Sequence, residues 1–318
     1  MTAGGAVGGT RTALFTHAAC LEHAPGPGHP ESPSRLRAVL AALDDPCLAA
    51  LERLEAPRAT REQLLRVHAA ALVDAVLAPL PAGAQRRLDA DTVQSPGSAE
   101  AALRAAGAAC AAIDAVMDGS VRRAFCAVRP PGHHATASQA MGFCLFNNVA
   151  VGAAHALAVH GLARIAIVDF DVHHGNGTAD SFRHEPRVLY ASTHQWPLYP
   201  GTGASEDRGE GNLVNVPLPS GAGSVEFRRA CEDEVLPALD AFRPQLVLVS
   251  AGFDAHRRDP LASLSLETDD YGWITARLVE LAVRHARGRL VSTLEGGYDL
   301  TALADSAAVH VQTLMTSP

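Results

Sequence analysis

The stretch "IVDFDVHHGNGT", residues 167–178, joins the end of an apolar run to a cluster of titratable side chains. Asp169, Asp171, His173 and His174 follow the apolar residues at near-alternating positions. Carboxylates and imidazoles at the mouth of a buried strand are costly to desolvate unless they are paired or bind a metal. The stretch therefore indicates both a central strand and a candidate site.

Further short apolar runs predict other buried strands, and helical patterns lie between them. The strands are predicted at 124–128, 164–168, 187–192, 245–250 and 289–294, and the helices at 61–78, 98–119, 147–160, 224–242 and 270–287. Thr60 and Gln63 form a capping-box pattern at the start of the first helix. Continuous apolar strands that alternate with helices favour an α/β fold, with a mainly parallel sheet covered by helices on both faces. Because no segment resembles a linker, we expect a single domain over residues 1–318.

Composition excludes several classes of protein. The 318 residues are 47% hydrophobic and carry a formal net charge of −8, so a general attraction to nucleic acid is not expected. The 6 cysteines are scattered without a C-x-x-C pair, which favours buried thiols in a reducing compartment. The N-terminus lacks the pattern of a signal peptide, and no apolar run has the length of a membrane span. We therefore expect a cytoplasmic protein with no membrane partner.

Polar side chains follow four of the predicted strands at their carboxyl ends. His133 and His134 follow 124–128, the cluster from Asp169 follows 164–168, Asp254 follows 245–250, and Tyr298 follows 289–294. In open α/β sheets, ligands bind in the crevice outside the carboxyl ends of the strands. We therefore expect these side chains to form an active site at that edge of the sheet.

The residue types at these strand ends indicate amide hydrolysis. Asp171, His173 and Asp254 offer two carboxylates and one imidazole, a set that suits a catalytic zinc with an open position. The tandem histidines can transfer protons, and Tyr298 can donate a hydrogen bond to an oxyanion. Each piece taken alone also has a structural explanation, as a helix cap, an ordered polar loop or a glycine turn. A purely structural explanation of all four would require four independent coincidences at one edge of the sheet, so a common site is the better interpretation.

Motifs along nearly the whole chain resemble those of the zinc-dependent histone deacetylases, within the arginase/deacetylase fold. They are "GPGHPESPSRL" (26–36), "RPPGHHA" (129–135), "GFCLFNNVAVGA" (142–153), "DFDVHHGNGT" (169–178), "STHQWPLYPGTG" (192–203), "VLVSAGFDAHRRDPLA" (247–262) and "LEGGYDL" (294–300). The forms "HHGNGT" and "LYPGTG" are similar to those of the class II-like bacterial amidohydrolases.

The resemblance implies two metal sites. Asp171, His173 and Asp254 match the ligands of one catalytic zinc per chain. The family also holds a potassium ion behind the zinc. Its ligands would be Asp169, Asp171, His173, Ser192 and Thr193, partly through backbone carbonyls.

The resemblance also implies catalytic roles. His134 matches the general base and acid, His133 matches its electrostatic partner, and Asp169 is placed to orient His133. Asn176 stands where class I enzymes carry an aspartate, so His134 is expected to be less basic here. Tyr298 matches the residue that polarises the scissile carbonyl.

The expected substrate contacts form a channel for an acyl-lysine. Phe143 and Tyr199 match its aromatic walls, Gly142 lies beside them, and Gly296 and Gly297 precede the catalytic tyrosine. Tyr199 replaces the phenylalanine of many relatives, which leaves the acyl preference open.

Other polar residues receive weaker assignments. His29 and Glu31 are predicted to border the pocket at its rim, and Asp91 lies in a loop that could reach it. His174 has no catalytic task and is expected to be structural.

These observations favour a zinc-dependent amidohydrolase that removes short acyl groups from lysine side chains in proteins or peptides. An acetylpolyamine amidohydrolase is the first alternative, although the short segment between Ala90 and Ser98 gives no room for the entrance loop of those relatives. A two-manganese ureohydrolase would need further aspartates where Gly175 and Asn176 stand. A non-enzymatic acyl binder is the third alternative, and the oligomeric state stays open.

Overall fold

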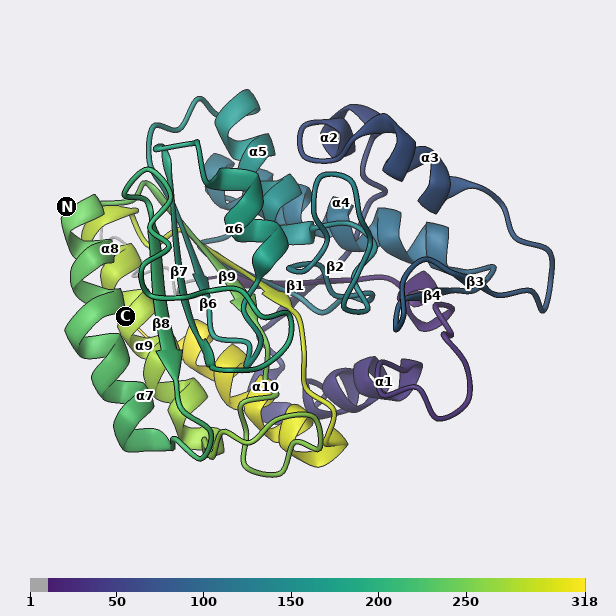
Figure 1. Ribbon diagram of the computed structural model, residues 1–318. Helices are drawn as coiled ribbons and strands as arrows, with labels where there is room; N and C mark the ends of the chain where they lie inside the picture. Colours follow the sequence, from purple (N-terminus) through teal and green to yellow (C-terminus); the bar gives the residue numbers. More distant parts are fainter. Residues whose placement is uncertain (1–10, 318) are drawn as a thin grey trace.

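Eight parallel strands form one sheet through the middle of the molecule, in the order β2-β1-β5-β10-β9-β6-β7-β8 (Figure 1). The computed structural model describes residues 11–317. The strands are β1 (Thr12–Thr16), β2 (Glu52–Glu55), β5 (Arg123–Cys126), β6 (Ile165–Asp169), β7 (Val188–Gln195), β8 (Leu213–Leu218), β9 (Leu246–Ala251) and β10 (Leu290–Leu294). The prediction of a parallel α/β sheet in one domain is confirmed.

Helices cover both faces of this sheet (Figure 1). One face carries α4 (Ser98–Asp118), α5 (Asn148–Val159) and α6 (Asn176–Phe182), and the other carries α1 (Pro33–Ala42), α7 (Ser224–Ala230), α8 (Leu236–Phe242), α9 (Thr268–His285) and α10 (Leu300–Thr316). The short helices α2 (Arg61–Leu65) and α3 (Ala70–Leu77) and the hairpin of β3 (Arg86–Arg87) and β4 (Val93–Gln94) lie beyond α4, on the right of Figure 1. Because both faces are covered, every residue of β5, β6, β9 and β10 is buried.

The helix predictions at 98–119, 147–160 and 270–287 are confirmed to within two residues at each end. Gly119 ends α4 in the left-handed conformation, with φ 84°, which glycine adopts without a steric penalty. The side chain of Asn147 caps α5 by accepting the N–H of Ala150. The predicted helix at 224–242 is continuous but contains a π-helical segment, Cys231–Val235, between α7 and α8.

The prediction of one helix over 61–78 is wrong, because tertiary contacts break it after α2. The capping box of Thr60 and Gln63 is present. Buried His68 then accepts the backbone N–H of Asn147 at 2.9 Å through Nε2, and its Nδ1 lies 2.9 Å from the carbonyl of Thr136. These bonds hold the residues between α2 and α3 against the loop before α5.

The strand patterns did not predict β1, β2 or β8. β2 is mostly exposed, with the sequence ERLE, and β8 contains Pro217 and two partly exposed positions. These two edge strands lack the continuous apolar run that marks a central strand, whereas β1, TALFT, is mostly buried but short. Within residues 11–317, no helix has the length and apolar character needed to cross a bilayer.

His310 of α10 lies in the core, far from solvent. Its two ring nitrogens lie 2.6 Å from Thr275 Oγ1 and 2.8 Å from Ser292 Oγ. Burial lowers its pKa from 6.5 to about 3, because no carboxylate offsets the cost of desolvating the cation.

We expect His310 to make the protein less stable as the pH falls. The unfolded chain binds a proton below about pH 6.5, whereas the folded chain leaves His310 neutral until about pH 3. Above pH 6.5 His310 is neutral in both states, so the free energy of unfolding does not depend on its protonation. Below pH 6.5 protonation of the unfolded chain lowers the free energy of unfolding by about 1.4 kcal/mol per pH unit. Urea unfolding between pH 7 and pH 5 should give a shallower pH dependence for His310→Gln than for the wild type.

The matched control is His184→Gln, which removes an exposed imidazole. Equal pH dependence in the wild type and His310→Gln would contradict the assignment.

Candidate active site

The four strands that end in polar side chains are neighbours in the sheet, in the order β5-β10-β9-β6. Their carboxyl ends therefore bring the side chains of four separate loops to one place. These side chains are His133 and His134 after β5, Tyr298 after β10, Asp254 after β9, and Asp171 and His173 after β6.

Asp171, His173 and Asp254 form a compact three-ligand cluster. Nδ1 of His173 lies 3.1 Å from Oδ1 of Asp171 and 3.2 Å from Oδ2 of Asp254, and one ligand atom from each residue lies within 4.8 Å of the others. Burial and the negative charge of Asp171 raise the pKa of Asp254, so the two carboxylates oppose each other's ionisation. Two buried carboxylates and one imidazole directed at one point fit a divalent metal such as zinc.

Glycine allows the carboxylates to sit against the backbone of the loop after β10. The N–H of Gly296 donates to Oδ2 of Asp171 at 2.8 Å, and a Cβ on Gly296 would lie 2.1 Å from Oδ2 of Asp254. The N–H of Val172 donates to Oδ1 of Asp254 at 2.8 Å. These backbone donors fix the orientation of both carboxylates.

The tandem histidines occupy different electrostatic environments. Nδ1 of His133 lies 3.0 Å from Oδ2 of Asp169, and its Nε2 lies 3.8 Å from Oδ1 of Asp171. Burial disfavours the His133 cation, but Asp171 and Asp169 outweigh burial and raise its pKa well above the ordinary value. Burial, followed by the positive charges of His133 and His173, lowers the pKa of His134 well below the ordinary value.

His134 is held by Asn176 and by the loop that forms the channel wall. Its Nδ1 donates to Oδ1 of Asn176 at 2.8 Å, which leaves Nε2 as the basic nitrogen. Gly142 has φ 55°, and a Cβ there would lie 2.4 Å from Cδ2 of His134. Phe143 also has a positive φ of 67°, and this turn directs its ring into the channel.

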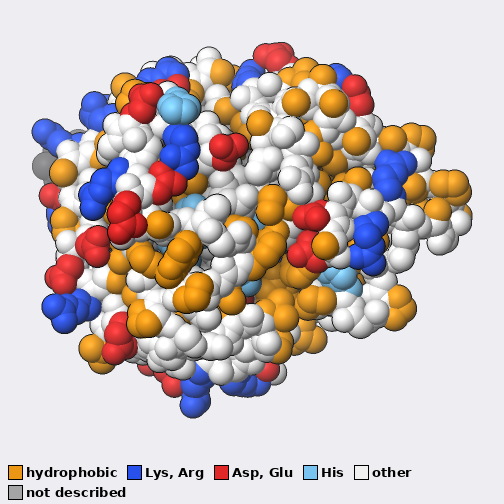
Figure 2. Space-filling model, viewed as in Figure 1, with side chains coloured by type: hydrophobic (Ala, Val, Ile, Leu, Met, Phe, Trp, Pro, Cys, Tyr) orange, Lys and Arg blue, Asp and Glu red, His pale blue; other side chains and the backbone are white. Residues whose placement is uncertain are grey.

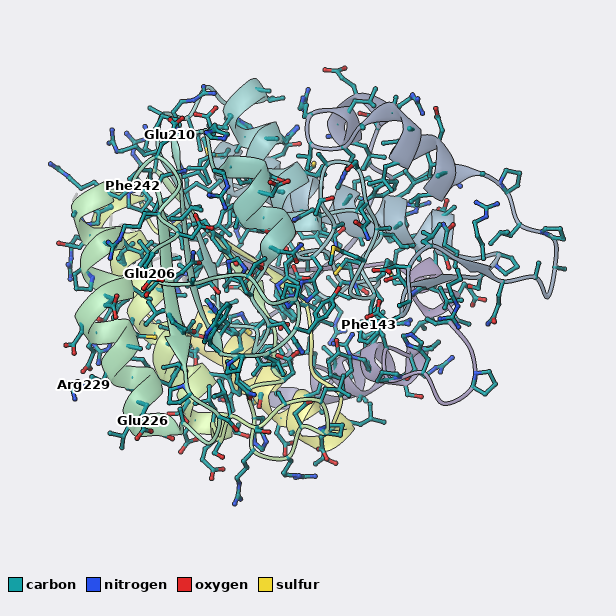
Figure 3. The ribbon with its side chains drawn as sticks, in the orientation of Figure 1. Phe143, Glu206, Glu210, Glu226, Arg229 and Phe242 are labelled. Carbon is teal, nitrogen blue, oxygen red and sulfur yellow. The ribbon has the colours of Figure 1, made fainter. Side chains whose placement is uncertain are left out.

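A narrow cavity of about 240 Å³ leads to these side chains. It is lined by Asp91, Pro131, His133, His134, Gly142, Phe143, His173, Tyr199, Leu261, Gly296 and Tyr298. Figure 2 shows hydrophobic side chains gathered around a hollow near the middle of this face, with carboxylates at its rim. Figure 3 shows Phe143 between the strand ends and the segments around α1. Gly297, expected among the substrate contacts, is absent from this lining, and its carbonyl accepts a hydrogen bond from Arg35 at 2.6 Å.

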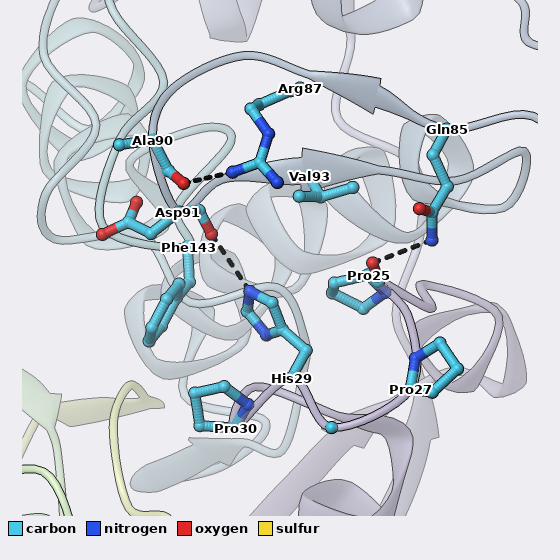
Figure 4. A pocket seen from close by; sticks show the side chains of 11 residues that line it. Pro25, Pro27, His29, Pro30, Gln85, Arg87, Ala90, Asp91, Val93 and Phe143 are labelled. Carbon is cyan, nitrogen blue, oxygen red and sulfur yellow. Dashed lines mark hydrogen bonds between the residues drawn. The ribbon is translucent and has the colours of Figure 1, made fainter.

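A wider groove of about 670 Å³ adjoins the mouth of the channel (Figure 4). Prolines of the 25–30 loop form one side, the β3–β4 hairpin forms the other, and the groove shares Asp91 and Phe143 with the channel. His29 lines the groove, as expected, with Nε2 3.0 Å from the carbonyl of Asp91 and its ring 4.8 Å from that of Phe143.

The expectation that Glu31 borders the pocket is wrong. Glu31 is fully buried, where Arg129 donates to both of its carboxylate oxygens and Arg35 donates to Oε1 at 3.2 Å. The guanidinium of Arg35 also donates to the carbonyls of Glu295 and Gly297 and stacks 4.8 Å from the ring centre of Tyr298. This buried ionic cluster supports the tyrosine loop from behind.

Asp259 also holds the loop of Tyr298, and the sequence did not predict this role. Its carboxylate accepts the N–H of Tyr298 at 2.7 Å and the N–H of Leu261 at 2.9 Å. It thereby connects the catalytic candidate Tyr298 to the apolar channel wall at Leu261. Asp259 belongs to the motif "VLVSAGFDAHRRDPLA", but nothing in that local pattern indicates a partner 39 residues later.

The remaining assignments concern the layer behind the channel. Buried His174 lies 2.8 Å from Thr202 Oγ1 and 3.1 Å from Asn215 Oδ1, and burial lowers its pKa to about 3, as suits a structural residue. Asp169 and Ser192 are paired in register across β6 and β7. The potassium ligands stay a prediction.

A second group of candidate metal ligands, Asp114, His155 and His160, lies between α4 and α5. Both Nε2 atoms approach Oδ1 of Asp114, at 2.8 and 2.7 Å. Nδ1 of His155, however, faces the Nη1 donor of Arg66 at 3.2 Å, so the ring proton belongs on Nε2 and points at Asp114. A metal-ligating histidine normally directs its other N–H at an acceptor, so this group fits a hydrogen-bonded contact better than a metal site.

Metal counting should distinguish the two groups. We expect about one equivalent of zinc per chain after dialysis, measured by mass spectrometry of the metal. Asp254→Ala should lose this equivalent, because one buried carboxylate and one imidazole remain, whereas Asp114→Asn should retain it. Loss of an equivalent in Asp114→Asn would contradict the assignment.

Comparisons with known proteins agree with this geometry. The histone deacetylase domain family matches residues 29–314. The chain is 44% identical over 311 residues to the histone deacetylase-like amidohydrolase of Pseudomonas aeruginosa, with 91% of this chain and 82% of that protein covered. It is 39% identical over 309 residues to the polyamine deacetylase HDAC10 of Homo sapiens, with 91% of this chain and 45% of that protein covered. The crystal structure of the HDA15 HD domain is similar with a TM-score of 0.91 at 38% identity, covering 96% of this chain and 89% of that one.

Proposed function

Because the chain belongs to the histone deacetylase family of amidohydrolases, we propose that it is a zinc-dependent deacylase of lysine side chains in proteins or peptides, acting on acetyl or other short acyl groups. The observation that carries the proposal is the narrow channel lined by His134, His173 and Tyr298, in which His173 belongs to the ligand cluster with Asp171 and Asp254. A potassium ion at Asp169, Asp171, His173, Ser192 and Thr193 belongs to the same proposal.

Asp171, His173 and Asp254 would hold the zinc. When bound at such a site, zinc lowers the pKa of a water molecule and polarises a carbonyl group. Val172 and Gly296 keep the two carboxylates in place through their backbone N–H groups.

His134 would take a proton from the attacking water and later give it to the leaving amine. Its Nδ1–H bond to Asn176 fixes the ring, so that Nε2 is the nitrogen that accepts the proton. The ring of His133 lies 4.0 Å away, and the carboxylates on both of its sides favour its cationic form. A cationic neighbour keeps His134 neutral in the resting site and strengthens it as an acid once protonated.

Tyr298 would donate a hydrogen bond to the substrate carbonyl and to the oxyanion that replaces it. Burial raises the pKa of its hydroxyl well above the ordinary value, so the hydroxyl keeps its proton. Arg35 on the ring and Asp259 on the backbone N–H restrict the tyrosine to one position, as a preorganised oxyanion donor requires.

The dimensions of the entrance favour a peptide substrate. Phe143, Tyr199 and Leu261 offer apolar walls to the methylene chain of a lysine. Outside them, the groove of about 670 Å³ has room for residues that flank the lysine. An acylated polyamine is the second candidate, because Asp91 places a carboxylate at the mouth and one relative is named a polyamine deacetylase.

Two chain variants test the catalytic roles directly. We expect His134→Ala and Tyr298→Phe to lower kcat on an acetyl-lysine peptide by at least about 100-fold, through loss of proton transfer and of the oxyanion donor, respectively. Zinc content should stay at the wild-type level. Near-wild-type turnover by either variant would contradict the role of that residue.

Substrate assays separate the two candidates. The wild type should have a higher kcat/KM on acetyl-lysine peptides than on acetylated polyamines of similar length. A preference for the polyamines would favour the second candidate and leave the catalytic roles unchanged.

Asp259→Ala tests how the tyrosine is positioned. We expect kcat to fall by about 10- to 100-fold with KM little changed, because the tyrosine hydroxyl is displaced from the carbonyl. In a Tyr298→Phe background the same change should cause little further loss, since the hydroxyl is already absent. Asp305→Ala on the exposed face of α10 is the control. Full additivity of the two losses would contradict a positioning role.

A further inference from the structure

Arginines gather at the edge of the sheet opposite the active site, away from the arrowheads in Figure 1. Arg122, Arg289, Arg243 and Arg164 each lie within three residues before the start of a strand, namely β5, β10, β9 and β6. These strands are neighbours in the sheet, so parallel pairing places all four arginines at one edge. The chain has a net charge of −8 and 34 acidic residues, so this gathering of positive charge runs against its overall composition.

A cavity of about 330 Å³ opens at this edge. We call it the basal pocket, and it is lined by Arg164, Gln245, His285, Ala286, Arg287 and Arg289. None of these lining residues is acidic. Within residues 11–317, no carboxylate forms an ion pair with Arg164, Arg287 or Arg289.

The polar groups around the basal pocket leave donors directed into it. Oε1 of Gln245 accepts the N–H groups of Ala163 and Arg164 at 2.7 and 3.1 Å, which leaves its NH2 group for the pocket. Asp240, which is bonded to the lining residue His285, accepts from Arg284 at 2.5 Å and from His285 at 2.8 Å. Arg284 and His285 are therefore the partners of the Asp240 carboxylate, and the arginines of the basal pocket are not.

The pKa of Arg289 shows that the arginines at this edge repel one another. Partial burial and the positive charges of Arg287 and Arg122 lower the pKa of its guanidinium. A bound anion would remove the repulsion and supply the missing acceptors.

We propose that the basal pocket binds a small phosphate-bearing molecule, through the guanidinium groups of Arg164, Arg287 and Arg289 and the amide of Gln245. Guanidinium forks match phosphate oxygens in geometry and charge. The volume lies at the lower end of the range for small-molecule pockets, about 300–1,000 Å³, and favours a diphosphate or a phosphorylated metabolite over a long polyanion. The negative net charge of the chain also disfavours nucleic acid.

A ligand in the basal pocket would contact residues that directly precede three strands whose other ends carry active-site residues. β6, β9 and β10 begin at the basal pocket and end at Asp171, Asp254 and Tyr298. We therefore expect a bound anion to raise the melting temperature by mass action.

Inorganic diphosphate is the first probe, used with the zinc-loaded full chain at constant ionic strength. A hydroxamate should occupy the active site, so that diphosphate neither removes zinc nor binds there. We expect saturable binding by calorimetry and a matching rise in melting temperature. Inorganic phosphate and a phosphorylated sugar, compared in parallel, then distinguish a free anion from a phosphate group on a larger metabolite.

Arg289→Gln and Arg287→Gly test the assigned side chains. Arg287 has φ 56°, so glycine removes the guanidinium without straining the backbone. Each variant should weaken diphosphate binding about tenfold or more, because it loses at least one charge-assisted hydrogen bond to the anion. Arg187→Ala is the control, because Arg187 precedes β7 at the same edge but is paired with Glu185.

Three results would overturn the proposal. They are no saturable binding of any probe by the wild type, equal binding by the wild type and the two pocket variants, and an equal loss in the Arg187→Ala control. If a single-stranded oligonucleotide binds more tightly than diphosphate, and if this binding depends on Arg289, the ligand of the basal pocket is nucleic acid and not a small molecule. Deacylase activity of the variants checks that they are folded and tests the proposed function separately.

Discussion

Asp171 and Asp254 place two carboxylates against each other at the ends of β6 and β9, where both are buried. Unpaired charges in such a place cost several kcal/mol each, so everything around them must compensate. The structure supplies His173 between them and backbone N–H groups from Val172 and Gly296. A metal ion bound by Asp171, His173 and Asp254, as proposed, would supply the remaining positive charge, and it would then stabilise this end of the sheet as well as take part in the chemistry.

The same constraint explains why the surrounding loops are so closely packed. Gly296 allows backbone to contact the carboxylates directly, and Gly142 allows it to contact His134. Arg35 contacts the ring of Tyr298, and Asp259 accepts its backbone N–H. A reaction that depends on a fixed donor and a fixed base needs these supporting bonds, because a small displacement of either group lowers the rate steeply.

Charge is distributed unevenly along the strands. The carboxyl ends of β6 and β9 carry the buried acids, and the opposite edge carries the arginines of the basal pocket. A bound cation would stabilise the buried acids at one end of the strands, and a bound anion would stabilise the arginines at the other end. Because the same strands run between the two edges, ligands at both would stabilise one rigid element of the fold.

The sequence by itself predicted the central strands, the parallel sheet, the residues at the strand ends, and the helices α4, α5, α7, α8 and α9, but it did not predict α1, α6 or α10. Continuous apolar runs and cap residues are local signals, and parallel pairing makes all carboxyl ends meet at one edge. Resemblance to a known family added the expected role of each residue.

Only the tertiary structure decided where isolated polar residues act. Glu31, expected at the rim, is buried with Arg129, and Asp259 supports Tyr298 across the loop. The helix at 61–78 breaks because His68 is hydrogen-bonded to Asn147. These partners lie far apart in the chain, so no local pattern encodes them. Their positions are set by hydrogen bonds and charges that exist only after the sheet has brought the loops together.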